Sequence, residues 1–208
     1  MQEKVRSIID ILTHRYPEAL CALQYEKDYE LLIAVRLSAQ CTDARVNLVT
    51  PALFAAYPTL ESLANAQVAD IETYIHSCGF YRQKAKDIVL ACQVLLQKHN
   101  GKVPGTMDEL LQLPGVGRKT ANLLLGDIFR QPGSVVCDTH CIRICGRLGL
   151  SQGKEPEKVE KQLRAILPPE ESGDFCHRIV LFGRDICTAR NPKCQQCPLS
   201  MHCTQWNL

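Results

Sequence analysis

Apolar side chains recur along most of this chain with the period of an amphipathic α-helix. The spacing i, i+3, i+4, i+7 places them on one face of a helix. Five stretches have this spacing: 5–12, 85–96, 121–128, 141–148 and 159–167. An extended pattern is confined to residues 134–137, which are too few to build a sheet. The pattern predicts an all-α protein of about ten short helices.

Polar and turn-forming residues indicate where these helices begin and end. Thr106 and Glu109 form a capping box ahead of an apolar run, and Thr42 is placed to cap another helix. The turn signals between helices are Gly79, Asn100-Gly101, Pro104-Gly105, Gly133 and Pro168-Pro169.

The composition is typical of a globular protein with buried cores. Of 208 residues, 46% are hydrophobic and 22% are charged, which excludes a disordered chain. No apolar run approaches the roughly 18 residues that a membrane-spanning helix needs. The N-terminal residues lack the pattern of a secretory signal. We therefore expect a soluble, cytoplasmic protein, and the short N-terminus favours a bacterial or archaeal cell over an organelle.

Four of the twelve cysteines stand close together near the C-terminus. They form the pattern C-x6-C-x2-C-x5-C: Cys187, Cys194, Cys197 and Cys203. This segment has no apolar period, so a metal centre bound by four thiolates would give it the fixed structure that burial cannot. Zinc sites commonly have two C-x2-C pairs, whereas one pair with longer flanking spacings favours an iron–sulfur cluster. Four free surface thiols are the alternative, although thiols so close together would oxidise.

The other eight cysteines are predicted to pack in the core. Cys137, Cys141 and Cys145 could suggest a second cluster, but Cys141 and Cys145 lie on the apolar face of their predicted helix. Buried cysteine behaves as a small hydrophobic residue. The same interpretation covers the scattered cysteines, which are Cys21, Cys41, Cys78, Cys92 and Cys176.

Residues 113–121, Leu-Pro-Gly-Val-Gly-Arg-Lys-Thr-Ala, form a candidate anion-binding hairpin between two predicted helices. Gly115 and Gly117 allow a sharp turn and leave backbone N–H groups uncovered at the positive end of the second helix, where they can bind a phosphate. An ordinary turn between helices is the alternative. Net charges of +3 over residues 112–150 and over residues 175–208 favour a polyanionic partner.

Two residues of this basic region are candidate catalysts. Lys119 falls on the side of its helix opposite the apolar residues. It is either a solvated lysine or an amine nucleophile, activated by loss of solvent or by a neighbouring cation such as Arg118. Asp138 opens the next helix and is either an N-cap or a carboxylate whose second oxygen faces a substrate. His140 alone is more typical of a surface or capping position.

In their order and spacing, these motifs closely resemble the endonuclease III family of helix-hairpin-helix DNA glycosylase/AP lyases. The hairpin with its lysine, residues 136–140 and the four C-terminal cysteines carry the resemblance, together with residues 31–35, 38–40, 42–43 and 46–47. The resemblance implies two α-helical domains with a DNA cleft between them. One is a six-helix barrel over residues 21–130 that bears the hairpin. The other is formed by residues 1–20 and 131–208 and holds one four-iron four-sulfur cluster on the C-terminal cysteines.

The resemblance also implies an activity, which is removal of oxidised pyrimidines from duplex DNA and strand cleavage 3′ to the abasic site by β-elimination. Lys119 matches the family's Schiff-base lysine and Asp138 its catalytic aspartate. Gln40 resembles the residue that fills the space left by the extruded base, and Phe80 stands where the family usually has a leucine wedge. The DNA contacts expected are Gln40, Phe80, Gly115, Val116, Gly117, Arg118, His140, Arg143, Arg190 and Lys193.

The partner implied is double-stranded DNA containing damaged bases or abasic sites. The protein is expected to act as a monomer at the nucleoid and to have no membrane partner. A monofunctional glycosylase of the same superfamily is one alternative, although such enzymes generally lack a lysine at the position of Lys119. A non-catalytic iron–sulfur DNA-binding protein would bind DNA without cleaving it. An iron–sulfur electron carrier would need neither the hairpin nor Asp138.

Overall fold

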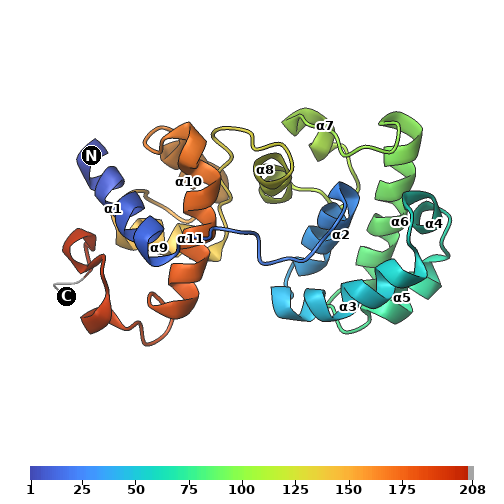
Figure 1. Ribbon diagram of the computed structural model, residues 1–208, viewed down its shortest axis with the longest axis horizontal. Helices are drawn as coiled ribbons and strands as arrows, with labels where there is room; N and C mark the ends of the chain where they lie inside the picture. Colours follow the sequence, from blue (N-terminus) through green and yellow to red (C-terminus); the bar gives the residue numbers. More distant parts are fainter. Residues whose placement is uncertain (206–208) are drawn as a thin grey trace. The chain divides into compact units, whose positions relative to one another are not determined.

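The computed structural model describes residues 1–205 and contains eleven α-helices and three short 3₁₀ turns in that range, with no strand (Figure 1). In the first half of the chain the helices are α1 (Gln2–Arg15), α2 (Asp28–Ser38), α3 (Asp43–Ala56), α4 (Leu60–Ala64), α5 (Val68–Ile75) and α6 (Tyr81–Lys98). The second half has α7 (Met107–Leu111), α8 (Arg118–Asp127), α9 (Thr139–Arg147), α10 (Pro156–Arg164) and α11 (Ser172–Asp185). The 3₁₀ turns are η1 (Pro169–Glu171), η2 (Cys194–Gln196) and η3 (Ser200–His202).

The chain divides into two compact units, each with its own hydrophobic core. Unit 1 consists of residues 1–20 and 130–208, and unit 2 consists of residues 21–129. The N-terminal helix α1 therefore belongs with the C-terminal third of the sequence rather than with the helix that follows it.

Unit 2 is organised around α2, which is buried on nearly every side. Its apolar run, residues 31–35, is at most 4% exposed. This helix packs against α3, α6 and α8, and the long helix α6 packs in turn against α4 and α5. A helix that is apolar all round must be covered by neighbours, so α2 forms the centre of this unit.

Unit 1 is held together by the packing of α1 and α9 on α11. The buried face of α1 is Val5, Ile8, Ile9 and Leu12, as the apolar spacing predicts. Ion pairs join this helix to the C-terminal half of the unit: Arg6 lies 2.8 Å from Glu171, and Arg15 lies 2.8 Å from Asp185.

The helix boundaries agree with the capping signals in the sequence. The Thr42 hydroxyl accepts a hydrogen bond from the Arg45 N–H, and the Thr106 hydroxyl accepts one from the Glu109 N–H. The Glu109 carboxylate accepts a hydrogen bond from the Thr106 hydroxyl, so one half of the predicted capping box is present and the other half takes a different form. Within residues 1–205, no helix is long and apolar enough to cross a bilayer.

Candidate functional site

The predicted hairpin is present between α7 and α8 in unit 2. Leu113 and Val116 are at most 9% exposed and anchor it in the core. Gly115 has a φ of +76°, a conformation that glycine adopts without strain. Gly117 is the N-cap of α8 and, having no side chain, makes no capping hydrogen bond to the N–H groups of the first turn. These backbone donors at the positive end of the helix form the expected anion-binding geometry.

A largely buried ion pair supports the backbone of this hairpin. The Arg36 guanidinium lies 2.8 Å from Asp87 Oδ2 through Nε and 2.6 Å through its terminal nitrogen. The Gln83 amide donates to the other carboxylate oxygen at 2.8 Å. A Cβ on Gly115 would lie 2.5 Å from Arg36 Nε and 2.9 Å from Asp87 Oδ2. The hairpin backbone therefore rests directly on the ion pair, and only glycine fits there.

Lys119 stands in the first turn of α8 with its side chain exposed. The opposite face of the helix is buried through Ala121, Leu124 and Leu125, as the periodicity predicts. Arg118, the preceding residue, is also exposed. The amine of Lys119 is therefore accessible to a molecule bound at the hairpin.

Gln40 and Phe80 lie on two neighbouring turns of unit 2. Both are exposed and both have left-handed backbone, with φ of 54° and 58°. The Gln40 carbonyl oxygen lies 3.8 Å from the position that a Cβ would take on Gly79. The structure thus brings the two turns into backbone contact and leaves the Phe80 side chain 68% exposed.

Lys84, a residue that the sequence analysis missed, holds one of these turns. Its side chain is 1% exposed, and its ammonium group donates hydrogen bonds to the carbonyl oxygens of Leu37 and Ala39 at 2.8 and 2.7 Å. Burial lowers the pKa of this lysine. Most helical lysines are solvated, and nothing in the sequence around position 84 distinguishes this buried lysine from them.

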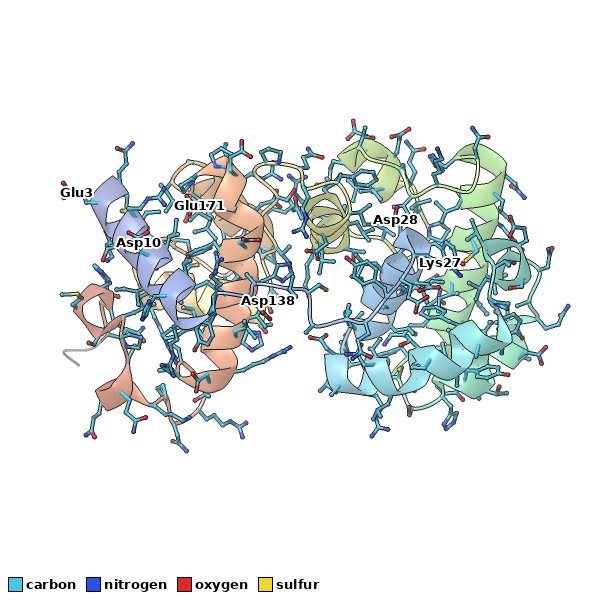
Figure 2. All side chains as sticks on the ribbon, in the orientation of Figure 1. Glu3, Asp10, Lys27, Asp28, Asp138 and Glu171 are labelled. Atoms are coloured by element: carbon cyan, nitrogen blue, oxygen red, sulfur yellow. The ribbon has the colours of Figure 1, made fainter. Side chains whose placement is uncertain are left out.

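Asp138 is the N-cap of α9 in unit 1 and is labelled in Figure 2. Its Oδ1 accepts a hydrogen bond from the Cys141 N–H at 2.7 Å, so the capping interpretation is confirmed. Its Oδ2 lies 2.9 Å from Nδ1 of His140. The carboxylate is therefore fixed at both oxygens by groups of its own helix.

The same helix contacts the cysteine segment through two arginines. Arg143 donates to the Cys187 carbonyl at 3.0 Å, and burial lowers the pKa of this guanidinium. Arg147 donates to the Cys187 sulfur at 3.2 Å and to the Thr188 carbonyl at 3.0 Å. Gly183 on α11 permits this packing, because a Cβ there would lie 2.7 Å from His140 and 3.1 Å from Arg143. Helix α9 thus links Asp138 to the first cysteine of the C-terminal pattern.

The four C-terminal cysteines lie in an irregular segment that contains η2 and η3. Cys194 is exposed and the other three are half-buried. The pKa of Cys197 is raised first by burial and then by the nearby thiols of Cys187, Cys203 and Cys194. In residues 1–205 no group of three His, Cys, Asp or Glu side chains has the arrangement needed to hold a single metal ion. Four thiols gathered in one segment fit the donor set of an iron–sulfur cluster.

Two basic residues of this segment are exposed. Arg190 is exposed, and its carbonyl accepts a hydrogen bond from the Thr188 hydroxyl at 2.6 Å. Lys193 is exposed and lies 3.7 Å from Asp185.

The remaining eight cysteines pack in or against the two cores, as predicted. Six of them are buried: Cys78, Cys92, Cys137, Cys141, Cys145 and Cys176. Cys21 and Cys41 are half-buried in loops and pack against the edge of the unit 2 core, so they too follow the prediction.

Comparison with known proteins identifies two family profiles in the chain. Residues 33–169 match the HhH-GPD superfamily base excision DNA repair protein, and residues 187–203 match the iron-sulfur binding domain of endonuclease III. Endonuclease III of Synechocystis is 44% identical over 97% of this chain and 92% of its own length. Endonuclease III of Escherichia coli is 40% identical over 94% of this chain and 92% of its own length.

Solved structures give the same result for the fold. A trapped endonuclease III–DNA covalent intermediate is 42% identical and matches with a TM-score of 0.93, over 100% of this chain and 97% of that chain. A non-covalent endonuclease III–DNA complex matches with a TM-score of 0.94 at 42% identity, with the same coverage. A thermostable thymine-DNA glycosylase, at 21% identity and a TM-score of 0.85, shares the fold over 99% of this chain and 97% of its own.

Replacing Gly115 should disturb the hairpin more than backbone strain alone explains. Gly115→Ala adds a Cβ in contact with Arg36 and Asp87, at a positive φ, so we expect destabilisation of more than about 1 kcal/mol. Gly133 has the same φ of +76° with no atom within 4 Å of its Cβ position, so Gly133→Ala isolates the cost of the backbone conformation. Chemical denaturation of both variants measures the difference. Equal losses would contradict the contact with the ion pair.

Replacing Asp138 should separate its structural role from its charge. Asp138→Ala removes the cap of α9 and should cost about 1 kcal/mol of stability. Asp138→Asn retains a capping oxygen, since asparagine and aspartate cap equally well, and should unfold close to the wild type. Thermal unfolding of both variants tests this, and equal destabilisation by Asn would show that the His140 contact, rather than the cap, is what stabilises the helix.

Replacing Arg147 should weaken the binding of the iron–sulfur cluster by the cysteine segment. Arg147→Met removes the hydrogen bond to Cys187, and loss of such an outer contact typically costs at least about tenfold in metal affinity. The variant should therefore release iron to a chelator faster than the wild type, which is measured as the loss of visible absorbance over time. Arg164→Met, at an arginine that pairs with Glu160 on α10, is the control and should release iron at the wild-type rate.

Proposed function

Since this chain belongs to the endonuclease III family within the HhH-GPD superfamily of base excision DNA repair proteins, we propose that Lys119 is its catalytic nucleophile and Asp138 its catalytic carboxylate. The protein is a DNA glycosylase with AP lyase activity that carries a four-iron four-sulfur cluster. The observation that carries the residue assignment is the hairpin, because it presents an exposed lysine amine one turn or less from backbone donors suited to a DNA phosphate.

DNA binding begins with the backbone. The N–H groups of Gly115 and Gly117 bind a phosphate, and Arg118 adds positive charge beside it. Val116 lies between them, with its N–H donating to the Leu113 carbonyl at 3.1 Å. His140, Arg143, Arg190 and Lys193 contact the backbone from unit 1. Contacts of this kind position the duplex without reading its sequence.

The damaged nucleotide then leaves the base stack. Extrusion costs a few kcal/mol, which contacts of the protein with the opened duplex offset. Phe80 enters the stack as an aromatic wedge, and Gln40 fills the space left by the base. Their adjacent exposed positions on neighbouring turns support this division of roles.

The chemistry has two stages. The neutral amine of Lys119 attacks C1′ of the sugar and displaces the base, which gives an imine after the ring opens. The imine acidifies the proton at C2′, and its loss expels the 3′ phosphate by β-elimination. Asp138 acts either by assisting deprotonation or, as an anion, by stabilising positive charge on the sugar, and its fixed position on α9 serves both roles.

The cluster is held by Cys187, Cys194, Cys197 and Cys203. Bound there, it cross-links a segment that has little regular structure of its own. Its role in this proposal is structural, because the segment it fixes bears Arg190 and Lys193.

The substrates we propose are oxidised pyrimidines and abasic sites in duplex DNA, and the protein acts as a monomer on the nucleoid of a bacterial or archaeal cytoplasm. The barrel with its hairpin corresponds to residues 21–130, and the cluster domain to residues 1–20 and 131–208. A monofunctional glycosylase or a non-catalytic iron–sulfur DNA-binding protein would use the same hairpin, but neither requires an exposed lysine at position 119.

Borohydride reduction during reaction with DNA containing an abasic site tests the nucleophile. Borohydride converts an imine between protein and DNA into a stable bond, so the wild type should give a covalent adduct. Lys119→Ala should lose that adduct by at least about 10²-fold, because no neighbouring group replaces the amine. Gel electrophoresis of the reduced mixture measures it.

Lys102→Ala is the matched control, because Lys102 is an exposed lysine of the same unit outside the hairpin, and it should trap at the wild-type level. Undiminished trapping by Lys119→Ala would place the nucleophile elsewhere, for example at the N-terminal amine. Salt-sensitive DNA binding without any trapping by the wild type would favour the non-catalytic alternative.

A further inference from the structure

Two cysteines outside the cluster segment lie beside the turns that carry Gln40 and Phe80. Cys41 follows Gln40 in the chain, and Cys78 precedes Gly79. The backbones of the two turns are in contact, since the Gln40 carbonyl oxygen lies 3.8 Å from the Cβ position of Gly79. A disulfide needs Cα atoms about 4.4–6.8 Å apart, and residues directly flanking such a contact are well placed for it.

The two thiols also interact with each other. Burial, followed by the charge and a side-chain hydrogen bond of Cys41, raises the pKa of the Cys78 thiol to about 11, against the opposing charge of Lys84. The Lys84 ammonium is fixed at the turn of Gln40 by its hydrogen bonds to the carbonyl oxygens of Leu37 and Ala39. The charges of Lys84 and Arg45 only partly offset the burial of Cys78, so Cys78 remains a thiol until a mixed disulfide forms beside it.

Exposure differs between the two residues in the way a stepwise reaction needs. Cys41 is half-buried in a loop and can meet a small molecule, whereas Cys78 is fully buried. Cys41 is therefore the residue that reacts first, and Cys78 the one that resolves the product from inside the protein.

We propose that Cys41 and Cys78 form an oxidisable dithiol, whose disulfide ties the turn bearing Gln40 to the turn bearing Phe80. The oxidant is a low-molecular-weight disulfide such as glutathione disulfide. The Cys41 thiolate attacks it, one glutathione leaves as a thiolate, and a mixed disulfide remains on Cys41. The Cys78 thiol then loses its proton and displaces the second glutathione. Two protein thiols are oxidised, and one glutathione disulfide is reduced to two glutathiones.

The disulfide would change how the protein engages damaged DNA. Insertion of Phe80 into the stack and of Gln40 into the vacated space requires each turn to adapt to the opened duplex, and a covalent bond between the turns restricts this. This consequence rests on the proposed roles of Gln40 and Phe80, whereas formation of the disulfide does not. In a reducing compartment such a bond is transient and reversible, as is typical of redox-sensing pairs.

The test is to equilibrate the cluster-loaded protein in glutathione buffers of increasing oxidised fraction, quench with acid, alkylate the free thiols and identify them by peptide mass spectrometry. We expect the joint loss of two alkylatable thiols, at Cys41 and Cys78, with an unchanged visible spectrum of the cluster. Return of both thiols after treatment with a dithiol reductant should follow. Both cysteines remaining alkylatable, or a bond from either of them to another cysteine, would overturn the proposal.

Single variants make the result specific. In Cys78→Ala, Cys41 should stop at the mixed disulfide with glutathione, and in Cys41→Ser, Cys78 should remain a thiol. Cys21→Ser is the matched control, because Cys21 is half-buried in the same unit, and it should form the Cys41–Cys78 bond as the wild type does. Oxidation of Cys78 in Cys41→Ser would contradict the assigned order of reaction.

A second measurement addresses the consequence separately. Oxidised protein should bind DNA containing an abasic-site analogue more weakly than the same protein after reduction, and the Cys41→Ser variant should show no such difference. A disulfide that forms without changing DNA affinity would refute the effect on the turns while leaving the dithiol and the Lys119 chemistry intact.

Discussion

The ion pair between Arg36 and Asp87 is the interaction on which the hairpin of unit 2 depends. It lies directly beneath Gly115, and both carboxylate oxygens of Asp87 are occupied, by Arg36 and Gln83. Removing one partner of a fully buried pair costs about 3–5 kcal/mol, and the partial exposure of Arg36 makes the cost smaller here. The pair therefore fixes the position of the hairpin backbone. That position sets the direction of the N–H groups and of the first turn of α8, which carries Lys119.

Helix α9 has the corresponding role in unit 1. Its cap is Asp138, its first turn supplies His140, and its last turns supply Arg143 and Arg147, which reach Cys187. One rigid element therefore joins the candidate catalytic carboxylate to the cluster segment. Under the proposed roles, the cluster would act on catalysis through this helix, because Arg143 and Arg147 tie α9 to the segment that binds it.

Local features of the sequence predicted much of this site. The helical period of residues 121–128 placed Lys119 on the exposed face, and the position of Asp138 before an apolar stripe predicted its cap. The glycines at 115 and 117 predicted the turn. These are interactions within one or two turns of chain, which is the range that periodicity and capping rules cover.

Interactions between distant residues could not be predicted in this way. Arg36 and Asp87 are 51 residues apart, and each alone is typical of a solvated helix face. Lys84 is buried against the distant residues Leu37 and Ala39, and no local sequence pattern predicts this burial. Helix α2 has little helical period for the opposite reason, since it is buried on all sides and its apolar residues are continuous. The contact between the turns of Cys41 and Cys78 is likewise a product of the tertiary fold.

The most direct test of this account is a crystal structure of the protein after borohydride trapping on DNA with an abasic site. We expect a continuous bond from Nζ of Lys119 to C1′, a DNA phosphate on the N–H groups of Gly115 and Gly117, and an intact Arg36–Asp87 pair beneath them. A bond from any other amine, or a hairpin that makes no contact with the DNA backbone, would contradict it.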